Sequence, residues 1–309
     1  MATIPLLKRL SLLAAKVETT TGTPIALAAG DATWNAYNIS IQPEIEVEER
    51  EDPGGFNRRK GAPGARGGTV TFTVDLQWDG TTTPPAWATT FLPSCGWINS
   101  TGVFNPSSTA VKDAGPVKAL TIGVYSDGRK FFLAGCQGNF EIVCVSGKVI
   151  IFNFTFRGVW QVPVDLAILD PTHSTDDLIR WAGGTASYDG TAACVQEATI
   201  SSGNEIILRE CPTETAGYIS AVIVDRAPTV SWNPEAELVA NDPRHADFIL
   251  PTEGALAITA GDTFTIAAPK AQIMNVQGGD RDKLLTDDVE FMCNKNGATK
   301  DEELTLTFA

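Results

Sequence analysis

The residues that could do chemistry in this chain are few and far apart. Only two histidines occur, His173 and His245, and no histidine lies at metal-ligand spacing from a cysteine. The chain contains no GxSxG, HExxH or phosphate-loop motif. Gly135-Cys136-Gln137-Gly138 lacks the Lys-Ser/Thr step that follows a phosphate-binding turn. We therefore predict that the protein is not an enzyme and binds no cofactor and no metal.

Acidic and aromatic residues leave two alternatives open. Asp176-Asp177, Asp280-Arg281-Asp282 and Asp287-Asp288 do not have EF-hand spacing, so solvated loop charges explain them better than calcium binding does. Paired carboxylates that hydrolyse a glycosidic bond have no fixed spacing in a sequence, so a hydrolase stays an alternative. A carbohydrate-binding module is the other, although burial in strands or helices explains most of the seven tryptophans: Trp34, Trp78, Trp87, Trp97, Trp160, Trp181 and Trp232.

The six cysteines do not form a metal or disulfide pattern. None belongs to a CxxC pair, and a chain of 309 residues does not need disulfides to fold. We expect reduced, partly buried thiols at Cys95, Cys136, Cys144, Cys194, Cys211 and Cys293.

Strict alternation of polar and apolar residues is the dominant local pattern. In Thr69–Leu76 it places Val70, Phe72, Val74 and Leu76 on one face, which predicts a half-buried strand. Similar patterns predict further strands at 37–42, 45–49, 118–125, 130–135, 138–145, 149–156, 193–200, 205–210, 219–225, 228–232, 263–268, 270–277, 288–293 and 304–308. Ser126-Asp127-Gly128 and Ser146-Gly147 are typical of turns between strands.

Two short segments have helical patterns instead. Pro84–Leu92 begins with proline and carries apolar residues on one helical face. Asp242–Leu250 begins with Asp242 as a helix cap and Pro243 in the first turn. Each half of the chain therefore contains strands, one short helix and more strands.

The two halves also share residues at a spacing of about 160. The matched segments are Ile41, Glu46 and Arg50-Glu51 with Ile200, Glu205 and Arg209-Glu210; Thr69–Phe72 with Thr229–Trp232; and Leu92–Gly96 with Leu250–Gly254. This period is the size of a domain. We predict an all-β protein of two tandem β-sandwich or barrel domains, each with a short flanking α-helix. The domains span 1–165 and 166–309, and the Pro- and Asp-rich segment 163–177 links them.

Charge separates the two halves. Residues 1–165 contain equal numbers of basic and acidic side chains, so the whole net charge of −14 lies in residues 166–309. Such an acidic half repels the phosphate backbone of nucleic acids. The apolar run near the N-terminus is too short for a convincing signal peptide, so we expect an N-terminal arm or short helix in a non-secreted protein. No apolar run is long enough to span a membrane.

One segment of the first half, residues 44–68, has an unusual composition. It is acidic at its start, basic at its end and rich in glycine and proline between, which predicts a long flexible loop. The second half has only Cys211–Gly217 at the corresponding place. An acidic stem with a basic tip is suited to docking on the acidic surface of a neighbouring subunit. The candidate contact residues are Glu48, Glu49, Arg50, Glu51, Asp52, Phe56, Arg58, Arg59, Lys60 and Arg66.

The order of these segments resembles that of a known family. The opening KVETTTGTP at 16–24 is followed by GTVTFTVDL at 68–76, PPAW at 84–87 and SCGW at 94–97. The half closes with LAGCQGNFEIVCVSGKVIIFNFTFRGVW at 133–160, and the second half contains DRAPTVSWNPEA at 225–236 and GDRDKLLTDDVEFMC at 279–293. Together these segments resemble the tail tube proteins of long-tailed, siphovirus-like bacteriophages, in a version with a duplicated domain.

This resemblance implies a structural virion protein whose subunits form stacked rings around a lumen. The usual ring of this family has six copies of one domain, so three chains with two domains each would complete one ring. Viral DNA would pass through the lumen without specific binding. The implied partners are further copies of the chain and other tail proteins, and the implied location is the virion tail, assembled in the cytoplasm of the host bacterium. A phage tail-tip protein or carbohydrate-binding β-sandwich module is the alternative.

Overall fold

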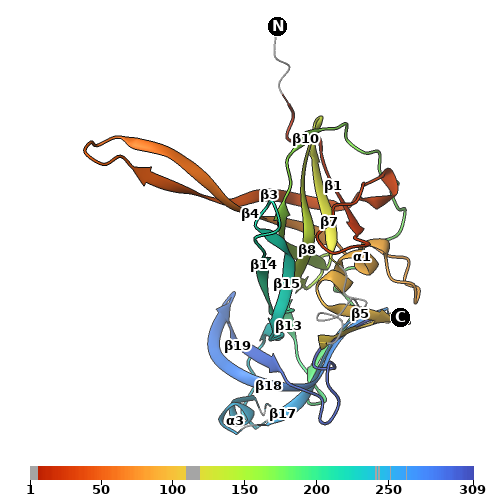
Figure 1. Cartoon of the computed structure of the whole chain (residues 1–309). Coiled ribbons are helices and arrows are strands. Elements are labelled where there is room, and N and C mark those ends of the chain that lie inside the picture. The colour runs from red at the N-terminus through yellow and green to blue at the C-terminus, as the bar shows by residue number, and fades with distance from the viewer. Residues whose placement is uncertain (1–5, 109–118, 241, 243, 251, 262) are drawn as a thin grey trace.

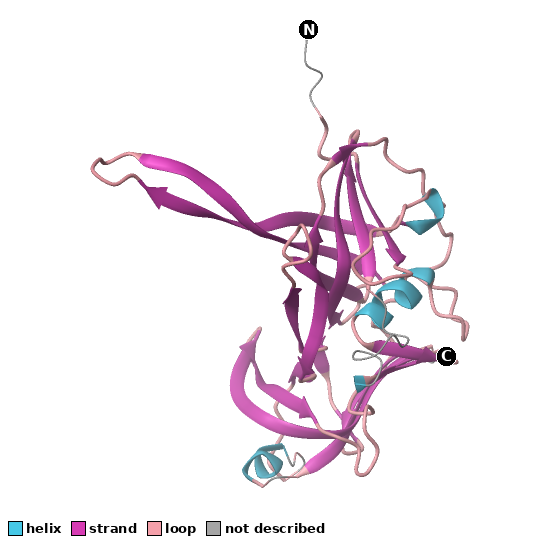
Figure 2. Cartoon of the chain, in the orientation of Figure 1, coloured by secondary structure: helices cyan, strands magenta, loops and turns pink. Residues whose placement is uncertain are grey.

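The computed structural model describes residues 6–108, 119–240, 242, 244–250, 252–261 and 263–309, and antiparallel strands dominate it (Figures 1 and 2). The all-β prediction is confirmed. In the first half the elements are β1 (Ser11–Val17), β2 (Ala32–Thr33), β3 (Ala36–Glu51), β4 (Arg58–Asp75), α1 (Ala86–Ser94), β5 (Trp97–Ser100), β6 (Val103–Pro106), β7 (Leu120–Ser126), β8 (Arg129–Val145) and β9 (Ile151–Trp160), with a short 3-10 helix at Ala29–Asp31. In the second half they are β10 (Val164–Asp165), β11 (Ala186–Tyr188), β12 (Thr191–Ala192), β13 (Val195–Ser201), β14 (Asn204–Glu210), β15 (Tyr218–Arg226), β16 (Thr229–Pro234), α3 (Arg244–Ile249), β17 (Glu253–Ala260), β18 (Phe264–Arg281), β19 (Leu284–Cys293) and β20 (Thr305–Phe308).

The strand with strict alternation forms as its pattern predicts. Val70, Phe72, Val74 and Leu76 are buried, and the threonines between them point to the opposite face. The turn prediction at Ser126-Asp127-Gly128 is also confirmed, since Ser126 pairs with Arg129 and both central residues have positive φ angles. Such φ angles match the twist of a two-residue hairpin, and Asp and Gly tolerate them.

Two predictions about local structure are wrong. The expected N-terminal arm or short helix is in part the strand β1, because Leu12, Leu13, Ala14 and Ala15 are buried where β1 pairs with β2 and β7. The expected flexible loop at 44–68 is a β-hairpin, in which β3 and β4 stay paired as far as Glu51 and Arg58. Its prolines and glycines suggested a loop, but Gly61 and Pro63 occur in a twisted ribbon with register shifts, where such residues are tolerated.

Both predicted helices are present. α1 begins at Ala86, one residue after its cap, and buries Trp87, Ala88, Phe91 and Leu92. At the second helix the Asp242 carboxylate accepts a hydrogen bond from the backbone N–H of Arg244 at 3.0 Å, as a capping residue does. Pro243, predicted in its first turn, and Pro251, in one of the matched segments, lie outside the described residues.

The strand neighbours repeat between the two halves. In the first half the order β3-β4-β9-β8-β7-β1 follows from the pairings, and in the second half the order is β13-β16-β19-β18-β17-β11. The two sets join where β8 pairs with β13, so one sheet continues through both halves. The domain boundary at residue 165 stays a prediction.

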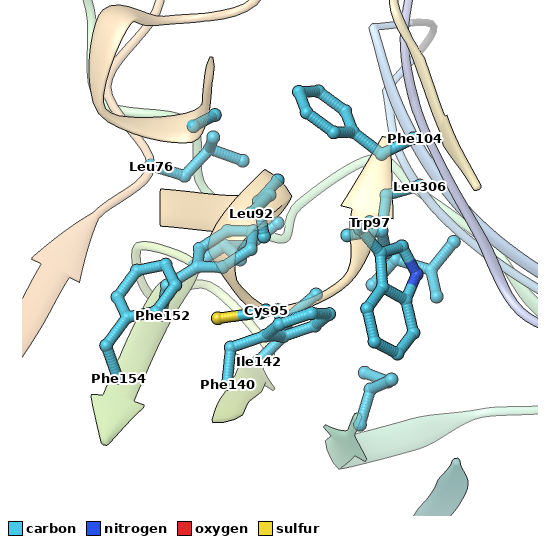
Figure 3. Packing of buried hydrophobic residues seen from close by; sticks show 14 of the residues in the cluster. Leu76, Leu92, Cys95, Trp97, Phe104, Phe140, Ile142, Phe152, Phe154 and Leu306 are labelled. Carbon is cyan, nitrogen blue, oxygen red and sulfur yellow. The ribbon is translucent and has the colours of Figure 1, made fainter. Parts of the chain in front are cut away.

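The core follows one row of this sheet. A chain of register partners crosses seven strands from both halves, and each residue is at most 3% exposed: Val74, Phe152, Ile142, Ile200, Val230, Phe291 and Ile273. Around α1, Leu92 and Cys95 pack on Phe152, Phe154 and Phe140 (Figure 3). A single apolar cluster includes residues from both halves.

Candidate assembly interface

The candidate contact residues lie on an arm that projects from the body (Figure 1). Glu48, Glu49, Arg50 and Glu51 belong to β3, and Arg58, Arg59 and Lys60 belong to β4. Asp52 and Phe56 lie in the turn that joins the strands. We call residues 46–63 the arm. The structure brings nine of the ten candidate residues together here.

The arm gains little stability from its own side chains. Arg58 Nη1 lies 2.7 Å from Glu49 Oε2, and Arg59 Nε lies 2.8 Å from Asp52 Oδ1, but these pairs are exposed and contribute little. Arg50 and Arg59 are direct register partners, an unfavourable arrangement of like charges. Phe56 is fully exposed at the tip. An isolated two-stranded ribbon is marginally stable in water, so the arm has the properties of a segment that another surface completes.

The tenth candidate residue, Arg66, lies at the root of the arm. Its backbone N–H donates to the carbonyl oxygen of Ala216 at 2.8 Å, and its Nη2 donates to the carbonyl oxygen of Thr215 at 3.0 Å. Arg66 therefore fixes the direction in which the arm leaves the body and does not take part in the tip.

Sequence reasoning missed a second group at the root, Glu44 and Arg157. Arg157 Nη2 lies 2.7 Å from Glu44 Oε2, and the Thr69 hydroxyl donates to the same carboxylate. Burial alone would raise the pKa of Glu44, but the hydrogen bonds from Thr69 and Arg157 and the arginine charge together lower it. The two residues are far apart in the sequence, and no local pattern indicated that β3 and β9 would lie on either side of β4 and bring them together.

As expected from the sequence, the second half has only a turn, Cys211–Gly217, at the place that corresponds to the tip of the arm. This is the turn of the hairpin β14–β15, whose strands of 7 and 9 residues are about half as long as β3 and β4, with 16 and 18 residues. This second hairpin packs on the first half. The Gln137 side-chain oxygen accepts from the backbone N–H of Ile223 at 2.8 Å, and Arg157 Nη1 donates to the carbonyl oxygen of Ile206 at 3.2 Å. The halves therefore differ in where their hairpins lie and not in whether they have one.

The face of the sheet opposite the core is polar. Two rows of register partners cross it from the first half into the second, and of these residues only Thr73 is buried: Asp75, Ile151, Val143, Thr199, Ser231, Glu290 and Asn275 in one row, and Thr73, Asn153, Glu141, Ser201, Thr229 and Met292 in the other. Glu141, Glu197 and Glu290 are exposed acidic side chains on this polar face. A broad uncharged or acidic surface of this kind does not attract nucleic acid.

Residues 8–293 match the family model described as phage tail tube protein. The chain belongs to the phage tail tube protein family. It is a structural subunit of the virion tail, a component that assembles with copies of itself and with other tail proteins. No protein in a search of curated proteins matches the chain. None of the described helices is long and apolar enough to cross a membrane.

The two histidines of this tail tube protein lie beside other side chains. His173 packs edge-on against Trp34, and His245 Nε2 lies 3.8 Å from Asp287 Oδ1. Within the described residues, no group of three His, Cys, Asp or Glu side chains is arranged to hold a metal ion. Cys95 and Cys136 are buried, and burial raises the pKa of each thiol well above its usual value.

The aromatic residues also argue against a sugar-binding role. Trp78, Trp87, Trp97, Trp181 and Trp232 are buried, and Trp34 and Trp160 are half-buried. Binding of a sugar ring needs exposed aromatic faces, so the carbohydrate-binding alternative is not favoured.

Glu18 is the most unusual ionisable group. Its side chain is 4% exposed and accepts hydrogen bonds from the Thr121 hydroxyl and the backbone N–H of Gly135, both at 2.8 Å, and of Gly22 at 2.7 Å. Burial raises the pKa of Glu18, and these hydrogen bonds offset part of the increase. The carboxylate thereby connects the end of β1 to β7 and β8.

Proposed function

We propose that three chains close one ring of six β domains, and that stacked rings form the wall of the tail tube. Each chain would supply a domain at 1–165 and a domain at 166–309. The repeated strand order supports this count, because two successive copies of one sheet within a chain halve the number of chains needed for a closed ring. The protein acts by assembly and not by catalysis.

The polar face is our candidate for the lumen wall. Its exposed carboxylates, Glu141, Glu197 and Glu290, would repel the phosphates of DNA and so let viral DNA pass without specific binding. The apolar row on the opposite face needs to stay buried under α1 and the flanking strands, which supports the polar side as the one that meets water and DNA.

The arm is our candidate for contact with neighbouring subunits. Its ten candidate residues, Arg66 at the root included, would dock against other copies of the chain once the protein has been made in the cytoplasm of the host bacterium. The single observation that carries this role is an exposed hairpin with a fully exposed Phe56 at its tip.

Electron microscopy of the purified chain tests the proposal. We expect hollow tubes with a regular ring repeat, and six density lobes per ring that correspond to three chains. Rings made of six chains would contradict the stoichiometry but leave the tube function in place. A chain that stays monomeric under all assembly conditions would contradict the proposal as a whole.

A further inference from the structure

The junction between the two halves of one chain has two parts. β13 pairs with β8, from Glu197 opposite Val145 to Ser201 opposite Glu141. The hairpin β14–β15, which follows β13 directly, then packs on β4, β8 and β9. A strand edge and the hairpin that continues it therefore hold the second half on the first.

The first half contains the counterparts of both parts. Register rows align the two copies: Ile41, Val70, Phe156 and Gly138 in the first, and Ile200, Val230, Phe291 and Ile273 in the second. β3 thus corresponds to β13, the arm to β14–β15, and β18 to β8. The sequence supports this alignment, since Arg50-Glu51 of the arm matches Arg209-Glu210 of β14.

Two of these counterparts, β3 and part of β18, have a strand paired along only one of their edges in the described part of the chain. Among the described residues, β3 has a strand neighbour only on the side of β4, and residues 274–281 of β18 have one only on the side of β19. Open edges of this kind favour pairing with another chain.

We propose that the junction between neighbouring chains repeats the junction within the chain: β3 of one copy pairs antiparallel with residues 277–281 of β18 in the next copy. The arm of the first copy then lies across β16, β18 and β19 of the second. This inference rests on the proposed ring and adds its residue-level contact.

The alignment fixes the register of the new pairing. Phe156 and Phe291 are counterparts, so Asn153 and Asp288, three residues before them, are counterparts too. Asn153 pairs with Glu141 in β8, and Asp288 pairs with Gln277 in β18, so Glu141 and Gln277 occupy equivalent positions. Glu141 pairs with Ser201, and the counterpart of Ser201 is Gln42. Gln42 of one chain therefore lies opposite Gln277 of the next, and Ile41 lies opposite Gly278.

Pro43 limits the length of this pairing. In the junction within the chain, the ladder of β13 and β8 runs to Ser201, the counterpart of Gln42, and the backbone N–H of the next residue, Ser202, still donates to the carbonyl oxygen of Phe140 at 3.0 Å. Pro43 is the counterpart of Ser202 and has no N–H to donate to a neighbouring strand. The pairing of β3 therefore ends at Gln42, one hydrogen bond short of the junction within the chain.

The exposed apolar residues of the arm fit the same arrangement. Val47 is the counterpart of Ile206, which is half-buried on the first half, whereas Val47 is 58% exposed. The paired strand of the second hairpin buries Ala221 and Ile223 against the first half. Docking on the next copy would cover Val47 as the first half partly covers Ile206.

Disulfide trapping in assembled tubes tests the register. In a chain with Cys194→Ser and Cys211→Ser, which removes the two thiols that are not buried, Gln42→Cys and Gln277→Cys are introduced together. Opposite residues of antiparallel strands have Cα atoms about 4.5–5.5 Å apart, within the roughly 4.4–6.8 Å that a disulfide spans. We expect loss of the monomer band under oxidation and gain of a covalent trimer. The matched control pairs Gln42→Cys with Asp280→Cys, a shift of about 10 Å along the strand, and should stay monomeric.

The outcomes separate this inference from the function on which it rests. Cross-linking that stops at a hexamer supports the register and contradicts the three-chain ring. Tubes that form without the Gln42–Gln277 cross-link, or that cross-link equally well at the control pair, overturn the register and leave the tube function standing. A cross-link in a sample without tubes by electron microscopy supports the pairing and contradicts the function.

Discussion

The backbone N–H of Arg66 donates to the carbonyl oxygen of Ala216 over 2.8 Å, and this bond connects the root of the arm to the turn of the hairpin β14–β15. The two hairpins occupy equivalent positions in the two halves, and the turn of the second hairpin holds the root of the first. The direction of the arm is therefore set by a contact between the halves and not by the arm itself.

Gly217, next to Ala216, provides a test of this contact. It has a φ of +77°, and a Cβ there would lie 2.8 Å from the Cβ of Ala65. Gly190 has a φ of +76° and nothing within 4 Å, so Gly190→Ala is a matched control that changes the backbone strain alone. We expect a loss of about 1 kcal/mol for the control and a larger loss for Gly217→Ala, with faster hydrogen exchange at the Arg66 amide. Equal effects of the two substitutions would show that the contact does not hold the arm.

Removal of the arm should separate folding from assembly. Residues 47–63 can be replaced by Asn-Gly, because Glu46 and Gly64 lie opposite one another and a two-residue turn can join them. We expect a change in the free energy of unfolding of less than about 1 kcal/mol, since surface changes have small effects, and no tubes by electron microscopy. Phe56→Ser, which keeps both strands, measures the contribution of the tip. Normal tubes from the shortened chain would contradict the role of the arm.

The continuous apolar row predicts that both halves unfold together. Phe152 belongs to the first half and Phe291 to the second, and each is fully buried. Truncation of either to alanine should cost about 3–5 kcal/mol and shift one common transition in calorimetry. Two transitions, of which each substitution shifts only one, would show that the halves are independent folding units.

Glu18 predicts a specific dependence of stability on pH. Because its pKa is raised in the folded state, the folded chain holds this proton more tightly than the unfolded chain does. Its contribution to stability is complete below 4.5, the ordinary pKa of a glutamate side chain, and is lost as the pH rises through the folded pKa. The difference between the free energies of unfolding of the native chain and of Glu18→Gln should therefore fall as the pH rises above 4.5 in denaturant titrations. A difference that is constant with pH would contradict the raised pKa.

Charge reversal tests the polar face as the lumen wall. A chain with Glu141→Lys, Glu197→Lys and Glu290→Lys should still form tubes, because all three side chains are exposed, and those tubes should retain DNA at low salt. The matched control places the same change in charge at Asp165, Asp170 and Asp177, which are exposed outside this face. DNA retention that is protected from nuclease only in the first variant supports the assignment. Equal, unprotected binding by both would indicate an outer surface.

The side-chain pattern of the chain predicted the local elements wherever that pattern had one explanation. Alternation fixed β4 around Phe72, the Asp127-Gly128 turn fixed the hairpin β7–β8, and proline at a helix start indicated α1. The matched segments at a spacing of about 160 indicated the repeat, and Ile41 and Ile200 occupy the same place in the register rows.

The positions of the hairpins and the contacts between distant residues depend on the folded arrangement and not on local patterns. Within residues 44–68 only 45–49 have an alternating pattern, and the arm beyond them packs on no other element of the described chain, so periodicity did not predict the rest of its strands. β1 is short and apolar, and a short apolar run can be a helix or a strand until a neighbour such as β7 pairs with it. The contacts Glu44–Arg157 and Arg66–Ala216 join distant parts of the chain, and such pairs depend on how the strands order themselves and not on any local preference.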